Sequence, residues 1–156
     1  MKNKNKTVWS NRFQSKMSLS FQKIGSSINI DKRLYEQDIS ASIVHAQMLV
    51  KQKIIKKENG DKIINGLKKI KTQIDKGNFE FKEKFEDIHL NIEKALFKII
   101  GPSAGYLHTA RSRNDQVVTD FKLWIKDASK EIVNDISLVM KSLIRKAEKN
   151  TDTVMP

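Results

Sequence analysis

The sequence has no cysteine and only two prolines among its 156 residues. Without cysteine, disulfide bonds and thiolate metal sites are excluded. No stretch approaches the roughly 20 consecutive apolar residues of a membrane-spanning helix. The basic residues 1–7 are not followed by the apolar run of a signal peptide. These absences predict a cytoplasmic protein that does not enter a membrane.

Arginine is also scarce, although the formal net charge is +12. Only five of the 30 basic residues are arginine, and the lysines are scattered along the chain among acidic residues. Lysine, isoleucine and asparagine are all encoded by AT-rich codons, so codon drift can supply this charge without a nucleic-acid partner. We therefore expect no nucleic acid as the main partner. The alternative, a basic nucleic-acid-binding helical protein, predicts a salt-dependent mobility shift of DNA or RNA.

Apolar residues recur at helical spacing along most of the chain, and no segment shows the spacing of a strand. The spacing predicts an all-α fold. One helix is predicted from Leu34 with Asp31 as its cap, and a second after a turn at 58–61, with Gly77 as its stop. The positions expected to face the core are Tyr35, Ile39, Ile43, Ala46, Val50 and Ile54 in the first helix, and Ile63, Leu67, Ile70 and Ile74 in the second.

A third helix is predicted from about Asp87 to the Gly101–Pro102 break, with Ile88, Ile92, Leu96 and Ile100 on one face. Residues 1–30 lack a clear period and are predicted to form an extended arm. The expected anchors of that arm are Trp9, Phe13 and Phe21.

The last apolar stripe runs from Val117 to Ala147, over thirty residues without glycine or proline. At 1.5 Å per residue, such a helix is roughly 45–50 Å long. Unbroken periodic helices of this length are typical of bundles and coiled coils. Because one helix cannot bury its apolar face alone, we expect a truncated piece of a longer polypeptide, or self-association.

Two of the five arginines, Arg111 and Arg113, flank Ser112 just before this long helix. Where lysine is the usual cation, arginine indicates a need for a planar, bidentate donor. A helix start presents unpaired N–H groups and a positive dipole end, and Asn114 or Asp115 is predicted as the N-cap. The segment therefore predicts a carboxylate or phosphate site. An ordinary capped helix entrance facing water is the alternative.

Two histidines lie on predicted helices. His89 has Glu93 four residues further on, but no third ligand has a suitable spacing, so no metal site is predicted. His45 is expected to be a packed or edge histidine without a role.

The segment Leu107–Gln116 closely resembles the first signature block of argininosuccinate lyases, in the fumarase/aspartase superfamily. The resemblance extends over essentially the whole chain. Further matching segments are Trp9–Phe13, Ser26–Ile28, Asp31, Leu34–Tyr35, Glu86–His89, Ile92–Glu93, Asp120 and Leu123–Trp124. The chain departs from the family where Ser10–Asn11 replaces two glycines and where Ala110 replaces a glycine. Since glycine reaches backbone angles that other residues avoid, we expect these loops to sit slightly differently.

The resemblance implies β-elimination of argininosuccinate to arginine and fumarate in arginine biosynthesis, by a homotetramer that needs no cofactor and no metal. It implies that the substrate-binding residues are Ser27, Ser112, Arg113 and Asn114. It implies that the residues ordering the site are Asp87, His89 and Arg111.

The resemblance also divides the chain into an N-terminal helical domain with an extended arm, residues 1–111, and the truncated start of a central helix bundle, residues 112–156. The general base and the catalytic serine are expected after Pro156. No catalytic residue is therefore assigned here, and the 156 residues alone are expected to be inactive. The alternatives are a sister lyase acting on adenylosuccinate or aspartate, and a non-catalytic helical interaction protein.

Overall fold

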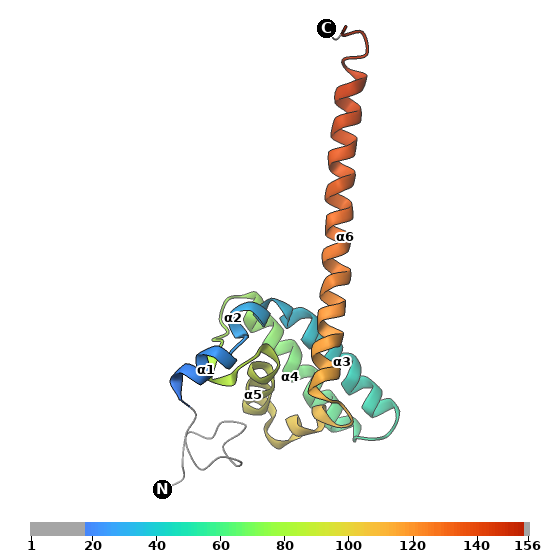
Figure 1. Ribbon diagram of the computed structural model, residues 1–156. Helices are drawn as coiled ribbons and strands as arrows, with labels where there is room; N and C mark the ends of the chain where they lie inside the picture. Colours follow the sequence, from blue (N-terminus) through green and yellow to red (C-terminus); the bar gives the residue numbers. More distant parts are fainter. Residues whose placement is uncertain (1–17, 155–156) are drawn as a thin grey trace. The chain divides into compact units, whose positions relative to one another are not determined.

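A computed structural model describes residues 18–154, and in this range the chain contains helices and no strand (Figure 1). The predicted all-α fold is confirmed. Trp9 and Phe13, two of the three expected anchors, lie outside the described residues. The α-helices are α1 (Leu19–Gly25), α2 (Ile28–Asp31), α3 (Tyr35–Lys51), α4 (Lys57–Asp75), α5 (Ile88–Ile100) and α6 (Arg113–Glu148). The 3-10 helices are η1 (Lys32–Leu34), η2 (Glu83–Phe85) and η3 (Gly101–His108).

The core lies where α4 packs against both α3 and α5. Most positions expected to face the core are buried: Ile39, Ala46, Ile63, Leu67, Ile70, Ile88, Ile92 and Leu96. The other expected positions, apart from Ile54, are partly buried: Tyr35, Ile43, Val50, Ile74 and Ile100. Leu49, which was not predicted, is also fully buried. The prediction that Ile54 faces the core is wrong, because α3 ends at Lys51 and the Ile54 side chain is 52% exposed. Its neighbour Ile55 is buried instead. Burying these branched side chains in a close-packed interior is the main stabilising contribution to this part of the fold.

The start of α4 differs from the prediction. The segment expected to be a turn, 58–61, lies inside the helix, which begins at Lys57. Gly60 is present there for packing, because a Cβ on it would lie 2.2 Å from Cγ2 of Val50. The other end agrees with the prediction: α4 ends at Asp75, and Gly77 follows with a φ of +70°, a conformation that glycine adopts at little cost.

The extended arm predicted for residues 1–30 is wrong over residues 19–25 and 28–30, which lie in α1 and α2. Ser18 caps α1 by accepting a hydrogen bond from the Phe21 N–H. Phe21 does not anchor this segment within the chain, since its side chain is 61% exposed. Both helices are short, and a helix of one or two turns leaves too few repeats for a period to be recognised.

Asp31 does not cap α3 as predicted. The N-cap of α3 is Leu34, which makes no side-chain cap hydrogen bond. Oδ1 of Asp31 instead accepts a hydrogen bond from the backbone N–H of Ile88, the first residue of α5. Asp87, the N-cap of α5, accepts from the Leu90 N–H. Two carboxyl groups therefore serve the start of α5, where unpaired N–H groups and the helix dipole favour negative charge.

Contacts divide the chain into two compact units, one ending at Asp120 and the other beginning at Phe121. The long helix predicted from the last stripe is confirmed as α6, which has 36 residues. Most of its apolar side chains are at least 39% exposed: Val117, Val118, Phe121, Ile125, Ile132, Val133, Ile136, Leu138, Val139, Met140, Leu143 and Ile144. None of the helices described is both long and apolar enough to cross a membrane.

Candidate functional site

The first turn of α6 is closed by a reciprocal pair of hydrogen bonds. Oγ of Ser112 accepts from the backbone N–H of Asn114 (3.2 Å), and a carboxylate oxygen of Asp115 accepts from the N–H of Ser112 (3.2 Å). Ser112 is therefore the N-cap of α6, and Asp115 at the third helical position accepts from its backbone N–H, as the third residue of a capping box does. The predicted N-caps, Asn114 and Asp115, therefore lie two and three positions too late, because the helix already begins at Arg113. The side chain of Asn114 is exposed and no hydrogen bond engages it among the described residues.

The two arginines flanking Ser112 have different surroundings. Nη1 of Arg111 donates to Oγ of Ser42 on α3 (3.1 Å), and the Arg111 side chain is half-buried. Arg113 donates to Oε1 of Gln116 and to Oε2 of Glu93, both at 3.4 Å, and its side chain is 34% exposed. Arg111 therefore ties the segment before α6 to α3. Arg113 reaches α5 and keeps part of its side chain exposed.

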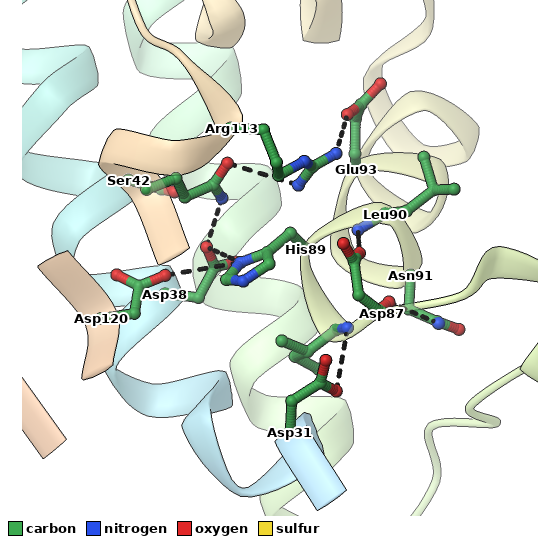
Figure 2. Close-up of polar contacts among 12 residues, drawn as sticks. Asp31, Asp38, Ser42, Asp87, His89, Leu90, Asn91, Glu93, Arg113 and Asp120 are labelled. Carbon is green, nitrogen blue, oxygen red and sulfur yellow. Dashed lines mark hydrogen bonds and ion pairs between the residues drawn. The ribbon is translucent and has the colours of Figure 1, made fainter. Parts of the chain in front are cut away.

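Beneath these arginines lies a fully buried polar cluster formed by Asp38, His89, Gln116 and Asp120. Nδ1 of His89 lies 3.0 Å from Oδ1 of Asp38 and 3.4 Å from Oδ2 of Asp120 (Figure 2). The side-chain amide of Gln116 donates to the same Oδ1 of Asp38. The cluster thus joins α3, α5 and the first two turns of α6 within one compact unit.

The pKa values of the two carboxyl groups in this cluster are shifted in opposite directions. Burial alone would raise the pKa of Asp38, but the hydrogen bonds and charge of His89, with bonds from Gln116 and Asp120, hold that pKa below its usual 3.8. Burial, followed by the negative charge of Asp38, raises the pKa of Asp120 to about 8. At neutral pH, Asp38 is therefore the carboxylate and Asp120 the carboxylic acid. The proton on Asp120 makes it a donor toward Asp38, whose Oδ2 otherwise receives no hydrogen bond among the described residues.

One ligand atom from each of Asp38, His89 and Asp120 lies within 4.8 Å of the others, a spacing that a metal ion can also use. The sequence spacing did not suggest this group, since its members come from three helices. Oδ1 of Asp38 already faces two N–H donors, and the guanidinium of Arg111 lies close enough to act electrostatically on both carboxyl groups. The positive charge and the donors thus come from the chain itself, which favours a hydrogen-bonded cluster.

A second group of predicted residues gathers at the start of α5. Oγ of Ser27 donates to Oδ2 of Asp31 (2.6 Å), and Oδ1 of Asp31 accepts from the Ile88 N–H. The carbonyl of Glu86 accepts from the N–H groups of Ser27 and Ile28. These contacts fix the segment around Ser27 against the turn that precedes Asp87 and the buried His89.

The predicted site residues thus lie in three places. Arg111, Arg113 and His89 line one small recess with Asp38, Glu93 and Gln116. Ser112 and Asn114 lie at the exposed first turn of α6, and Ser27 lies near Asp87. Sequence reasoning missed Asp38 and Gln116 as members of the site. For Asp38 the available signal was its position, because it lies one helical turn from Ser42 on the buried face of α3.

The backbone before Arg111 is strained. Ala110 has a φ of +54°, a left-handed conformation that costs a residue with a Cβ about 1 kcal/mol or more. His45 holds this turn, since its Nε2 lies 3.0 Å from the carbonyl oxygen of Thr109. Burial lowers the pKa of His45, so its neutral form is favoured and donates from Nε2. His45, which was expected to have no role, thus helps to shape the entrance of α6.

We therefore expect Ala110→Gly to raise the free energy of unfolding by about 1 kcal/mol, because glycine adopts this backbone conformation without strain. Thermal and denaturant unfolding measure the change. The matched control is Ala128→Gly inside α6, which should lower stability by about 1 kcal/mol. If both substitutions destabilise alike, the strain assigned to residue 110 is wrong.

Comparisons with known proteins identify the family of this sequence. A protein family described as lyase matches residues 11–156. An argininosuccinate lyase of Pelagibacter ubique is 52% identical over 157 aligned residues, which cover 100% of this chain and 34% of the relative. One from Ehrlichia ruminantium is 50% identical, covering 96% of the chain and 32% of the relative, and one from Bartonella bacilliformis is 46% identical with the same coverage. The chain spans about a third of the length of these curated relatives. Since the family match covers nearly the whole chain, the chain belongs to the lyase family.

Proposed function

We propose that these residues form the amino-terminal part of an argininosuccinate lyase, which cleaves argininosuccinate to arginine and fumarate in arginine biosynthesis. The observation that carries the proposal is the start of α6, where Ser112 caps the helix and the Arg113 side chain is partly exposed. These residues belong to the segment Leu107–Gln116, which resembles the signature block of argininosuccinate lyases. The name of the relatives, which are about 50% identical, supports the same substrate.

The chemistry explains why donors are needed here. A proton leaves the succinyl carbon beside a carboxylate, the electrons spread into that carboxylate, and the C–N bond then breaks with the guanidinium group leaving. In the intermediate, that carboxylate carries two negative charges, one more than it carries in the substrate. Fixed donors at a helix start stabilise such charge more than they stabilise the substrate. We assign substrate binding to Ser27, Ser112, Arg113 and Asn114, and ordering of the site to Asp87, His89 and Arg111.

In this proposal the proton-transfer groups, a general base and a serine, come from other segments of the assembled enzyme. The apolar side chains exposed along α6 support assembly, because a helix with such a face is stable when other helices cover it. We therefore propose a cytoplasmic homotetramer in which residues 112–156 begin a central helix bundle. Residues 1–111 form the preceding domain in this proposal.

The test uses the complete natural gene product that carries these residues. Fumarate release is measured with argininosuccinate, adenylosuccinate and aspartate as separate substrates. We expect fumarate from argininosuccinate alone, and none from the isolated 156-residue polypeptide. Fumarate from adenylosuccinate or aspartate would make the protein a sister lyase. A folded product that releases none would favour a helical interaction protein, for which the exposed face of α6 is the supporting observation.

A further inference from the structure

The guanidinium of Arg113 is held by two side chains. Its Nη1 donates to Oε1 of Gln116, and its Nη2 donates to Oε2 of Glu93, each at 3.4 Å. Glu93 is exposed to 44% in its side chain, whereas Gln116 is buried. Of the two partners, only Gln116 is fixed by the interior of the protein.

The orientation of the Gln116 amide is set by Asp38. The Nε2 group of Gln116 donates to Oδ1 of Asp38, so the amide oxygen of Gln116 points to the other side and faces Arg113. A reversed amide would place its oxygen against a carboxylate and its N–H groups against a guanidinium. Because Asp38 remains ionised, its charge allows one orientation only.

We propose that Gln116 is a positioning residue of the substrate site, an amide relay that transmits the fixed position of Asp38 to the guanidinium of Arg113. The relay rests on the proposed function, in which Arg113 contacts the succinyl end of the substrate. It keeps Arg113 in a binding position before the substrate arrives. The conformational entropy of the Arg113 side chain is then lost during folding and not on binding, so it offsets less of the binding free energy.

The relay is surrounded by charged and titratable groups from four elements. They are Asp38 on α3, His89 and Glu93 on α5, His108 on η3, and Arg111, Arg113 and Asp120 in or just before α6. A carboxyl group placed at residue 116 would lie next to the Asp38 carboxylate in a buried position. Burial and the like charge would both favour its protonated form. A protonated glutamate has the same donor and acceptor arrangement as glutamine, whereas an ionised one has no donor.

Two substitutions at residue 116 test the relay, and the second uses this difference between protonated and ionised glutamate. In the complete natural gene product, Gln116→Met removes donor and acceptor at similar volume, and we expect KM for argininosuccinate to rise about tenfold with kcat changed less than about twofold. For Gln116→Glu, we expect KM close to that of the wild type at pH 6.5. The ratio of the KM of this variant to the wild-type KM should then rise several-fold by pH 9. Ile70→Val, a core substitution in α4 that also lowers stability, is the matched control and should leave KM unchanged.

A purely structural role for Gln116 would not produce a pH-dependent ratio of KM values. The relay is therefore overturned if Gln116→Met leaves KM unchanged, or if the Gln116→Glu ratio is the same at pH 6.5 and pH 9. If the wild type does not cleave argininosuccinate, the proposed function fails, and a second measurement decides on the relay independently.

That measurement is the rate of guanidinium rotation by NMR in the 156-residue chain, which has only five arginines to assign. We expect slower rotation for Arg113 than for the exposed Arg145, and rotation of Arg113 at the Arg145 rate in Gln116→Met. Equal rates in the wild type would overturn the relay without the use of any variant.

Discussion

Replacing Asp120 by asparagine should stabilise the protein, and the gain should grow as the pH rises. Asp120 is fully buried, and neither of its oxygens accepts a hydrogen bond among the described residues. Burial and the charge of Asp38 raise its pKa from 3.8 to about 8. Asparagine mimics the protonated acid, because it is neutral and can donate to Asp38, but it never has to ionise in the interior.

The direction in which stability changes with pH follows from proton linkage. Between pH 4 and pH 8 the folded protein holds a proton on Asp120 that the unfolded chain has lost, so the contribution of Asp120 to stability falls as the pH rises. Each pH unit in this window costs up to about 1.4 kcal/mol, which gives roughly 3–4 kcal/mol between pH 5 and pH 8. The pKa of Asp38 is lowered, and its contribution changes only in more acidic solution.

Denaturant unfolding from pH 5 to pH 9 measures the effect as the difference between Asp120→Asn and the wild type. Asp120→Ala serves as the control. It also removes the titrating group, but it leaves a cavity and takes a donor away from Asp38, so it should be less stable than Asp120→Asn at every pH. A difference between Asp120→Asn and the wild type that stays constant across this range would show that Asp120 is ionised in the folded protein.

The helices could be predicted because their apolar positions repeat many times. The stripes through Ile63, Leu67 and Ile70 in α4 and through Ile88, Ile92 and Leu96 in α5 are buried as expected, and the long α6 was predicted from spacing alone. The errors occur where the repeat is too short or where packing prevails. The helices α1 and α2 have only seven and four residues, and Gly60 was taken for a turn although it lies where α4 packs closely on Val50.

The candidate site could be predicted only where its residues are adjacent in the sequence. Arg111, Ser112 and Arg113 stand together, and their donor chemistry indicated an anion site. The buried cluster beneath them could not be predicted, because Asp38 contacts His89, which lies 51 positions further along the sequence, and Gln116, which lies 78 positions further along. Such contacts depend on how α3, α5 and α6 pack, which the spacing within any one helix does not contain.

The largest functional effect should come from removing two donors at the start of α6. In the complete natural gene product, Arg113→Ala combined with Asn114→Ala removes a guanidinium and a side-chain amide. The capping oxygen of Ser112 is left in place. Loss of one donor that stabilises a developing charge typically costs about a hundredfold or more in rate. We therefore expect kcat/KM for argininosuccinate to fall at least about a thousandfold, although the change in net charge is small.

A matched control removes charge from the same helix away from the site. Lys122→Ala with Lys126→Ala lowers the positive charge of α6 at two exposed positions and should leave kcat/KM within about twofold of the wild type. Circular dichroism of both double variants verifies that α6 still forms. This comparison separates fixed donors from a general attraction of an anionic substrate to a basic protein.

The most direct measurement is the rate of fumarate release from argininosuccinate by the variant lacking the Arg113 and Asn114 side chains. The side chains that open the long helix are predicted to bind the two succinyl carboxylates, so fumarate release should be nearly abolished while the protein remains folded. Release at the wild-type rate would show that the succinyl group binds elsewhere.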